Sequence, residues 1–209
     1  IVFNIFTIYP SGDTTSQDHT EQAQSGCEYN GIYSGKIVWG PECGVIVTAN
    51  SLFDTLIIKP GSHIQIDPVF GIAFNHIVCE GTKDSMIVFT KNINDYGLWS
   101  GIESFRDEAV FKYTIFEYAS PIQRPTLVGP GDKVSFEDCI FRYNYLGINS
   151  NDLISLSGNS YMTRCLFEDN SAYSRWLVHV DKNNWGWTGE ISNNIFTGNS
   201  TWHPSQVFP

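Results

Sequence analysis

The chain has 209 residues, of which 16% are charged and 14% aromatic, and its formal net charge is −10. This length suits a single domain with a sizeable core. The 12 Lys and Arg residues form no basic cluster, which excludes nucleic-acid binding because phosphate neutralisation needs grouped cations. No run of about 18 apolar residues occurs, so no membrane span is expected. So few charges on so apolar a chain indicate that part of its surface is covered, with copies of itself as the candidate cover.

Residues 1–35 are predicted to form an N-terminal strand and a polar linker, apart from the main body at 36–209. The apolar run 1–8 precedes residues 10–26, which are polar and small and therefore typical of a surface loop. The start, without Met or a basic leader, indicates either a mature end left by signal cleavage or a fragment boundary. A strand on such a tether can pair with an open sheet edge, its own or a neighbour's.

From Lys36 onwards the chain consists of short β-rich runs separated by Gly and Pro turn signals. The first runs are 36–39, 45–48, 56–58, 64–66, 72–74, 77–79 and 86–90. No helical spacing of apolar residues extends over ten positions in this part of the chain. Short, mostly non-alternating apolar strands suit parallel sheets that stack against other sheets. The sequence therefore predicts an all-β fold.

A seven-residue motif recurs four times in the second half of the chain. Its copies are Tyr113–Ala119, Asp138–Asn144, Arg164–Asn170 and Asn193–Asn199. The central phenylalanines are 25, 26 and 29 residues apart. A short apolar strand followed by a polar turn, repeated at this interval, predicts a coiled β-solenoid, because each repeat leaves an apolar face that only the next repeat covers.

Equivalent side chains of successive coils are expected to stack about 4.8 Å apart. Three ladders follow from the motif: Phe116, Phe141, Phe167 and Phe196; Ile115, Ile140, Leu166 and Ile195; and Asn144, Asn170 and Asn199. The asparagine amides are expected to hydrogen-bond along the axis of the stack. The first motif departs from this pattern, with Ala119 in place of Asn.

The order of shorter motifs in the first half is also informative. It runs Val45-Ile-Val-Thr48, Pro60-Gly61, Ile64-Gln-Ile66, Gly81-Thr82, Ile87-Val-Phe-Thr90 and Trp99-Ser-Gly-Ile102. Together with the later repeats, this order resembles that of right-handed parallel β-helix surface proteins, the pectate-lyase-like solenoids, over residues 36–199. The resemblance implies three parallel sheets around a dry core and a place outside the cytoplasm. It implies no particular reaction.

Carboxylates beside the repeats are the candidate catalytic residues. They are Glu137, Asp138, Glu168 and Asp169, with Arg142 and Arg164 close in sequence. Polysaccharide lyases and hydrolases on β-helices use such carboxylates, with calcium or basic partners. The favoured alternative is a set of solvated turn residues, since the Asn-Thr-Asp, Asp-Asp and Gly-His-Gly words of polygalacturonases and the Arg-rich motif of pectate lyases are missing. The five scattered histidines show no ligand spacing, so neither a metal nor another cofactor is expected.

Five cysteines occur without a C-x-x-C motif. Cys139 and Cys165 occupy the same position in successive coils, which allows either a disulfide or two stacked free thiols. Cys27 and Cys43 flank the start of the main body, where a bridge would pin the loop. Cys79 is then unpaired, and is either buried or available to a neighbouring copy.

Two further features concern surface contacts. Trp185 and Trp187 lie on the same side of a strand-like stretch. They suit a sugar-stacking platform or, as the favoured interpretation, a cap or a contact between subunits. Asn199 begins an Asn-Ser-Thr sequon, a glycosylation candidate that fits a secreted protein.

The ends of the predicted solenoid lead to the functional hypothesis. No amphipathic capping helix is evident at either end, and uncapped coils favour head-to-tail stacking. We therefore expect an extracellular protein that self-assembles through its ends and edges into a surface layer, sheath or filament. In this architecture it is similar to the amyloid-like sheath proteins of methanogenic archaea. The alternatives are a polysaccharide-degrading enzyme and a carbohydrate-binding adhesin or tail-spike module that contacts surface glycans.

Overall fold

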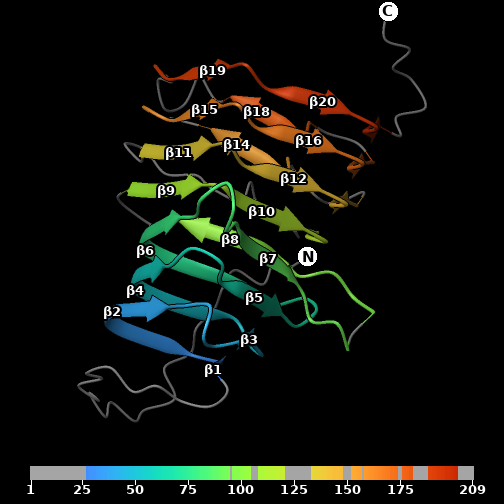
Figure 1. Ribbon diagram of the computed structural model, residues 1–209. Helices are drawn as coiled ribbons and strands as arrows, with labels where there is room; N and C mark the ends of the chain where they lie inside the picture. The colour runs from blue at the N-terminus through green and yellow to red at the C-terminus, as the bar shows by residue number, and fades with distance from the viewer. Residues whose placement is uncertain are drawn as a thin grey trace, which may run out of the picture.

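A computed structural model describes residues 27–94, 96–104, 108–120, 133–147, 152–156, 158–173, 176–180 and 188–201 (Figure 1). Within these ranges the regular elements are β-strands, and the pairings between named strands are parallel. The strand predicted at residues 1–8 and most of the predicted linker lie outside the described residues. The fold is all-β, as predicted, and its long parallel sheets are consistent with a β-solenoid.

Sheet 1 runs the full length of the stack. Its strands, in spatial order, are β1 (Cys27–Tyr29), β3 (Val45–Val47), β5 (His63–Ile66), β7 (Ile87–Lys91), β10 (Thr114–Glu117), β12 (Ile140–Arg142), β16 (Leu166–Glu168) and β20 (Ile195–Thr197). The spatial order follows the chain order, with one strand from each coil. This regular order is what places equivalent motif positions directly above one another.

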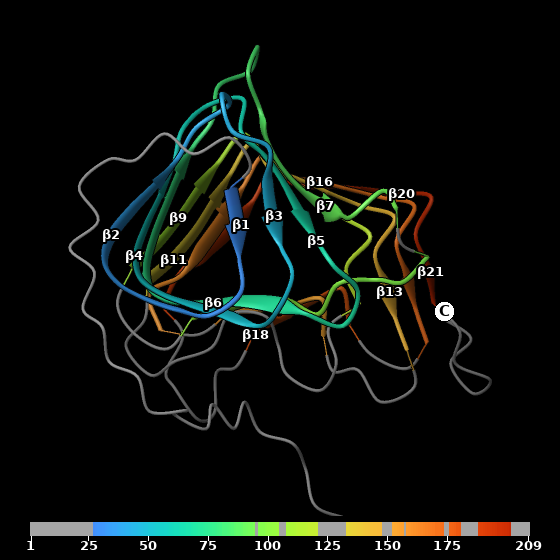
Figure 2. The ribbon, with the colours of Figure 1, turned by 90° about the horizontal axis from the view of Figure 1, so that it is seen from below.

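Sheet 2 forms the facing wall. Its strands, again in chain order, are β2 (Ile32–Trp39), β4 (Ser51–Ile58), β6 (Gly71–Glu80), β9 (Glu108–Lys112), β11 (Lys133–Glu137), β15 (Tyr161–Thr163) and β19 (Glu190–Ser192). Seen along the stack, the two walls converge at one side (Figure 2).

The second wall changes in the middle of the molecule. The long strand β6 pairs with two strands of the next coil: its first half with β8 (Gly101–Ser104) and its second half with β9. Two short sheets appear in the later coils. Sheet 3 contains β13 (Tyr145–Leu146), β17 (Ser171–Ala172) and β21 (Ser200–Thr201), and sheet 4 contains β14 (Ile154–Leu156) and β18 (Val178–Val180). Later coils are therefore divided into more, shorter strands than the first ones.

The core contains two stacked rows of side chains. The phenylalanine ladder of sheet 1 is confirmed: the rings of Phe116, Phe141, Phe167 and Phe196 stack with centroids 5.1, 4.7 and 4.6 Å apart. Phe89 extends it by one coil. The facing row of sheet 2 comprises Trp39, Ile58, Cys79, Phe111, Phe136, Met162 and Ile191. The rows interlock edge to face, as between Phe136 and Phe141 at 5.3 Å.

The predicted aliphatic ladder is also in register, since Ile115 pairs with Ile140, Ile140 with Leu166, and Leu166 with Ile195. It lies on the outer face of sheet 1, because successive side chains of a strand point to opposite faces and the phenylalanines take the inner one. Its first three members are half-buried and Ile195 is exposed.

Left-handed backbone conformations mark both ends of the motif. The first residues, Tyr113, Asp138, Arg164 and Asn193, have φ between 45° and 57°. The sixth residues, Tyr118, Tyr143, Asp169 and Gly198, have φ between 52° and 64°. Each motif strand is thus bounded by two sharp corners, a conformation that costs most residues free energy and favours Gly, Asn and Asp. Stacked side chains compensate at the second corner, where the Tyr118 and Tyr143 rings lie 5.6 Å apart.

The predicted asparagine ladder is confirmed at the seventh motif position. Asn144 Nδ2 donates to Asn170 Oδ1 at 2.9 Å, and Asn170 Nδ2 donates to Asn199 Oδ1 at 2.9 Å. The same amides also donate to backbone carbonyls, Asn144 to Phe116 and Asn170 to Phe141. At Ala119, which lacks an amide, the backbone N–H donates to Asn144 Oδ1 and begins the ladder. The turn is therefore tied to its neighbours along the axis.

Candidate functional site

The most distinctive surface is the last described coil, residues 190–201, which we call the terminal coil. Its strands β19, β20 and β21 each pair with the preceding coil. Within the described ranges no strand pairs with their other edge. A row of backbone N–H and C=O groups is thus available for another strand.

The terminal coil also exposes two side chains whose equivalents in the preceding coil are fully buried. Phe196 is 51% exposed, whereas Phe167 beneath it is fully buried. Ile191 is 37% exposed, whereas its partner Met162 is fully buried. One face of the Phe196 ring stacks on Phe167, so its exposure is that of the opposite face. Ile195 adds an outward apolar side chain that is 62% exposed. Among the described residues, the terminal coil is therefore a core layer that no further strand covers.

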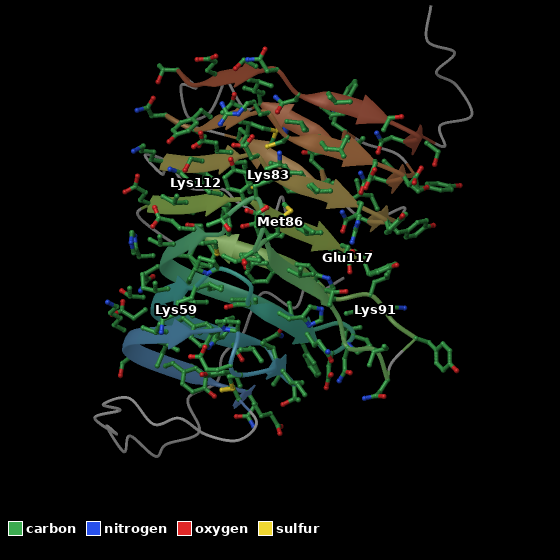
Figure 3. The ribbon with its side chains drawn as sticks, viewed as in Figure 1. Lys59, Lys83, Met86, Lys91, Lys112 and Glu117 are labelled. Carbon is green, nitrogen blue, oxygen red and sulfur yellow. A yellow bond between two sulfur atoms is a disulfide. The ribbon has the colours of Figure 1, made fainter. Side chains whose placement is uncertain are left out.

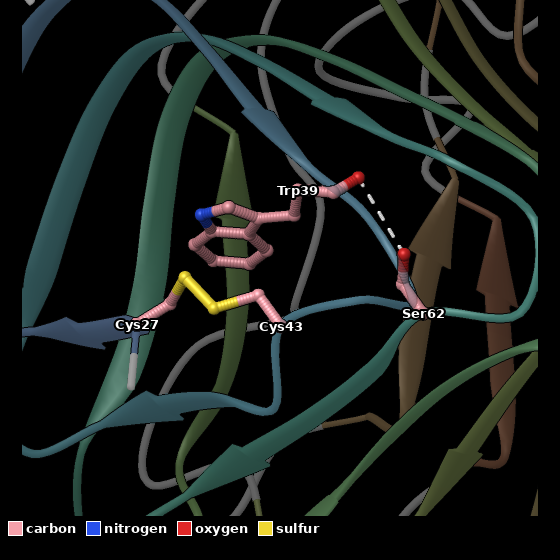
Figure 4. The surroundings of a disulfide bond; sticks show 4 residues. All are labelled: Cys27, Trp39, Cys43 and Ser62. Atoms are coloured by element: carbon pink, nitrogen blue, oxygen red, sulfur yellow. Dashed lines mark hydrogen bonds between the residues drawn. A yellow bond between two sulfur atoms is a disulfide. The ribbon is translucent and has the colours of Figure 1, made fainter. Parts of the chain in front are cut away.

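The opposite end of the stack is built differently. A disulfide joins Cys27, at the start of β1, to Cys43, just before β3 (Figure 4). The bond lies beside the indole of Trp39, whose carbonyl accepts a hydrogen bond from Ser62 Oγ. Tyr29 and Phe53 pack on Trp39 with centroids 5.0 and 5.2 Å away, and burial raises the pKa of Tyr29. The first coil is therefore a closed ring over an aromatic cluster.

The structure brings two of the four candidate carboxylates together with a cation. Arg164 donates to both carboxylate oxygens of Asp138, at 2.9 and 2.8 Å, and also to Glu137. Lys112 Nζ lies 3.6 Å from Glu137 Oε2, on the outside of the stack (Figure 3). The hydrogen bonds from Arg164 lower the pKa of Asp138, which keeps it ionised. A general acid needs the opposite shift.

The other pair, Glu168 and Asp169, lies at the far end of the motif strand. Asp138 occupies the first motif position and Asp169 the sixth, so five residues of strand, on the order of 15 Å, separate the two corners. Acid–base pairs of glycoside hydrolases lie about 5–10 Å apart. Glu168 pairs with Arg142 across the neighbouring strands β16 and β12. Arg142 Nε in turn donates to Glu117 Oε2 at 2.7 Å. This geometry suits charged turn residues that stabilise stacked corners.

Replacing Asp138 by Asn should lower the free energy of unfolding by less than about 1 kcal/mol at pH 7, a figure discounted for solvent screening because its partner Arg164 is 48% exposed. Its pKa is lowered in the folded state, so its contribution is present above the unfolded pKa of about 3.9 and is lost as the pH falls below it. Urea unfolding at pH 7 and pH 3 should show the difference between variant and wild type shrinking at pH 3. Asp84→Asn, at an exposed position, is the matched control. An Asp138→Asn difference that stays constant with pH would contradict the pairing.

All five cysteines fall within the described residues. The bridge between Cys27 and Cys43 is present, whereas Cys79, Cys139 and Cys165 are buried free thiols. For Cys139 and Cys165 the structure thus shows the stacked-thiol alternative and not the disulfide. Cys79 is fully buried between Ile58 and Phe111, so it is not available to a neighbouring copy while the protein is folded.

The remaining predicted site residues have different outcomes. Trp185 and Trp187 lie outside the described residues. Asn199 uses its amide nitrogen, the atom to which a glycan would be attached, to donate to the Phe167 carbonyl at 2.8 Å. The sequence reasoning missed the contact between the exposed His179 and the buried Asp152, whose Nδ1 and Oδ2 atoms lie 3.0 Å apart. Their separation of about one coil is the only signal that pointed to it.

Within the described part of the chain, no three His, Cys, Asp or Glu side chains gather as a metal site. The same residues include no helix of the length and apolar character needed to cross a membrane. Comparison of the chain with protein-family models, with curated proteins and with solved structures finds no match. The functional argument therefore depends on the geometry of the coils themselves.

Proposed function

We propose that this chain is an extracellular structural protein, a right-handed parallel β-helix that self-assembles through its ends and edges into a cell-surface layer, sheath or filament. The observation that carries the proposal is the terminal coil. Phe196 and Ile191 are exposed there, although the equivalent side chains of the preceding coil are fully buried. A second copy would cover them.

The first coil of another copy has the features needed to provide that cover. Strands β1 and β2 are the outermost strands of sheets 1 and 2, just as β20 and β19 are at the other end. Head-to-tail addition therefore extends both sheets at once, in parallel and with the usual strand spacing. Such a contact joins two different surfaces and does not close on itself, so it generates filaments. The disulfide favours addition by holding the first coil in one conformation.

The disulfide supports the proposed location of the protein. A disulfide persists in oxidising compartments, which supports a place outside the cytoplasm. The candidate catalytic carboxylates support a structural role more than an enzymatic one, because Asp138 is held in an ion pair with Arg164 and far along the strand from Asp169. Within the residues that the structure describes, no specific feature favours the enzyme or the adhesin.

The proposal predicts that Phe196→Asp weakens assembly. A carboxylate on the open ring face would be buried without a partner in the contact, which should raise the concentration needed for assembly at least about tenfold, equivalent to 1.4 kcal/mol. Size-exclusion chromatography with light scattering, over a concentration series of non-reduced protein, measures this. Negative-stain electron microscopy should show wild-type filaments or sheets.

Ile93→Asp is the matched control, because Ile93 is equally apolar and 83% exposed but lies in a turn after β7. It should assemble like wild type. Far-UV circular dichroism checks that the Phe196 variant keeps its fold, which is expected because half of the side chain is already exposed. A wild-type protein that stays monomeric at all concentrations would overturn the proposal, and so would a Phe196→Asp variant that assembles normally.

A further inference from the structure

Two free thiols stack one coil apart inside the core. Cys139 immediately precedes β12 and Cys165 immediately precedes β16, and these strands pair in register. The backbone N–H of Leu166 donates to the Cys139 carbonyl at 2.9 Å. The two Cα atoms are therefore about one strand spacing apart, roughly 4.8 Å, which lies within the range of about 4.4–6.8 Å that a disulfide spans.

The pair is shielded from solvent and lies beside backbone carbonyls. Both cysteines are 1% exposed. The Cys139 sulfur lies 3.3 Å from the Phe111 carbonyl and the Cys165 sulfur 3.5 Å from the Thr163 carbonyl, within hydrogen-bond distance. Each thiol has a single proton, so it donates either to its carbonyl or to the other sulfur. The same motif position holds Thr114 in the coil before and Asn194 in the coil after, so each thiol has only the other as a sulfur neighbour in this row.

We propose that Cys139 and Cys165 are a redox pair, which closes into a disulfide between two successive coils by exchange with a small-molecule disulfide. In the first step, the Cys165 thiolate attacks one sulfur of the small disulfide, forms a mixed disulfide and releases one thiolate. In the second step, the Cys139 thiolate attacks the Cys165 sulfur and releases the second thiolate. The pair is oxidised by two electrons, the small disulfide is reduced to two thiols, and the two protons pass to them.

The environment assigns different roles to the two sulfurs. The pKa of Cys165 is lowered, chiefly by its hydrogen bond with Cys139, whereas burial raises the pKa of Cys139. The thiolate of Cys165 therefore forms more readily and is the attacking group. Since both are buried, exchange requires local opening of the coils around them. The reduced and oxidised forms are then two states of one site, and the structure shows the reduced state.

Formation of this bond does not require assembly. It ties the coil of β12 to the coil of β16, on which the terminal coil lies. The oxidised protein would thus carry a covalent link near each end of the stack, with Cys79 as the remaining free thiol.

Oxidised glutathione in excess is a suitable probe. Native protein is incubated with it, quenched with acid, denatured, alkylated with iodoacetamide and analysed by intact mass. Before treatment three alkylated thiols are expected, and after treatment one, with a peptide map that joins Cys139 to Cys165. The Cys79→Ala variant should pass from two alkylated thiols to none. The Cys139→Ala variant should form no internal bond and should keep glutathione on Cys165.

A parallel incubation in urea just below the unfolding transition allows the coils to open. If three thiols remain in both incubations, the proposal is wrong. It is also wrong if the wild type stops at a mixed disulfide, or if the new bond joins two molecules. None of these outcomes depends on whether the protein assembles, so they leave the proposed function to its own experiment.

Discussion

Replacing Asn170 by Ala should destabilise the protein by about 4 kcal/mol. Asn170 is 1% exposed and takes part in four hydrogen bonds along the ladder. Its removal takes one partner from each of four groups: the backbone N–H and the side-chain amide of Asn144, the Phe141 carbonyl and Asn199 Oδ1. The Asn144 amide keeps the Phe116 carbonyl and Asn199 Oδ1 keeps the backbone N–H of residue 170, so the Asn144 N–H and the Phe141 carbonyl carry most of the cost. Each buried group that loses its partner costs about 1–3 kcal/mol, and the lower value is appropriate where neighbours can shift. Urea unfolding followed by circular dichroism measures the loss.

Two further variants make this prediction specific. Asn170→Asp keeps the shape and the accepting oxygen but loses the donating nitrogen, so it should lose at least half as much free energy as Ala. Asn75→Ala removes an exposed amide that donates to Asp54, and should cost about 0.5 kcal/mol or less. Equal effects of Asn170→Ala and Asn75→Ala would show that the ladder does not hold the turns together.

Replacing Phe167 by Ala should cost about 3–5 kcal/mol, the usual range for a fully buried aromatic ring. Its ring is fully buried between Phe141 at 4.7 Å and Phe196 at 4.6 Å. The cavity left would separate two stacked rings, which the parallel strands on either side cannot bring together without breaking their register. Urea unfolding gives the total loss, and hydrogen exchange shows which coils open.

Phe196→Ala is the internal comparison, because it removes the same side chain one coil further along. Phe196 is half exposed, so its loss should cost about 1 kcal/mol in the monomer. If the two variants were equally destabilised in dilute solution, the terminal coil would be covered in the monomer. The contrast between them therefore also tests the surface that the proposed assembly uses.

The recurring motif made the ladders predictable from sequence. Its constant spacing fixed which Phe and Asn residues stack, because one coil corresponds to one copy of the motif. The face on which Ile140 and its equivalents lie could not be read as easily, since these residues are as apolar as the core row. The left-handed corners at Tyr113 and Tyr143 have no sequence signal, because tyrosine rarely adopts positive φ.

Other features depend on contacts that no local pattern records. Residues 72–74 and 77–79 were predicted as separate runs, but Asn75 and His76 continue between them in the single strand β6, because β4 pairs along its length. The sequence predicts an uncapped end, but only the structure identifies the residues that are exposed there.

The position of the first disulfide has a mechanical consequence. The linked cysteines are 16 positions apart, and β2 lies between them. If the chain is pulled from its N-terminal side, tension passes from residue 27 to residue 43 through the sulfur atoms, and the segment between them carries no load. A length on the order of 50 Å of extended chain is therefore withheld until the bond is reduced. Under tension, the later coils would unfold one after another, whereas the first coil would stay closed by its disulfide.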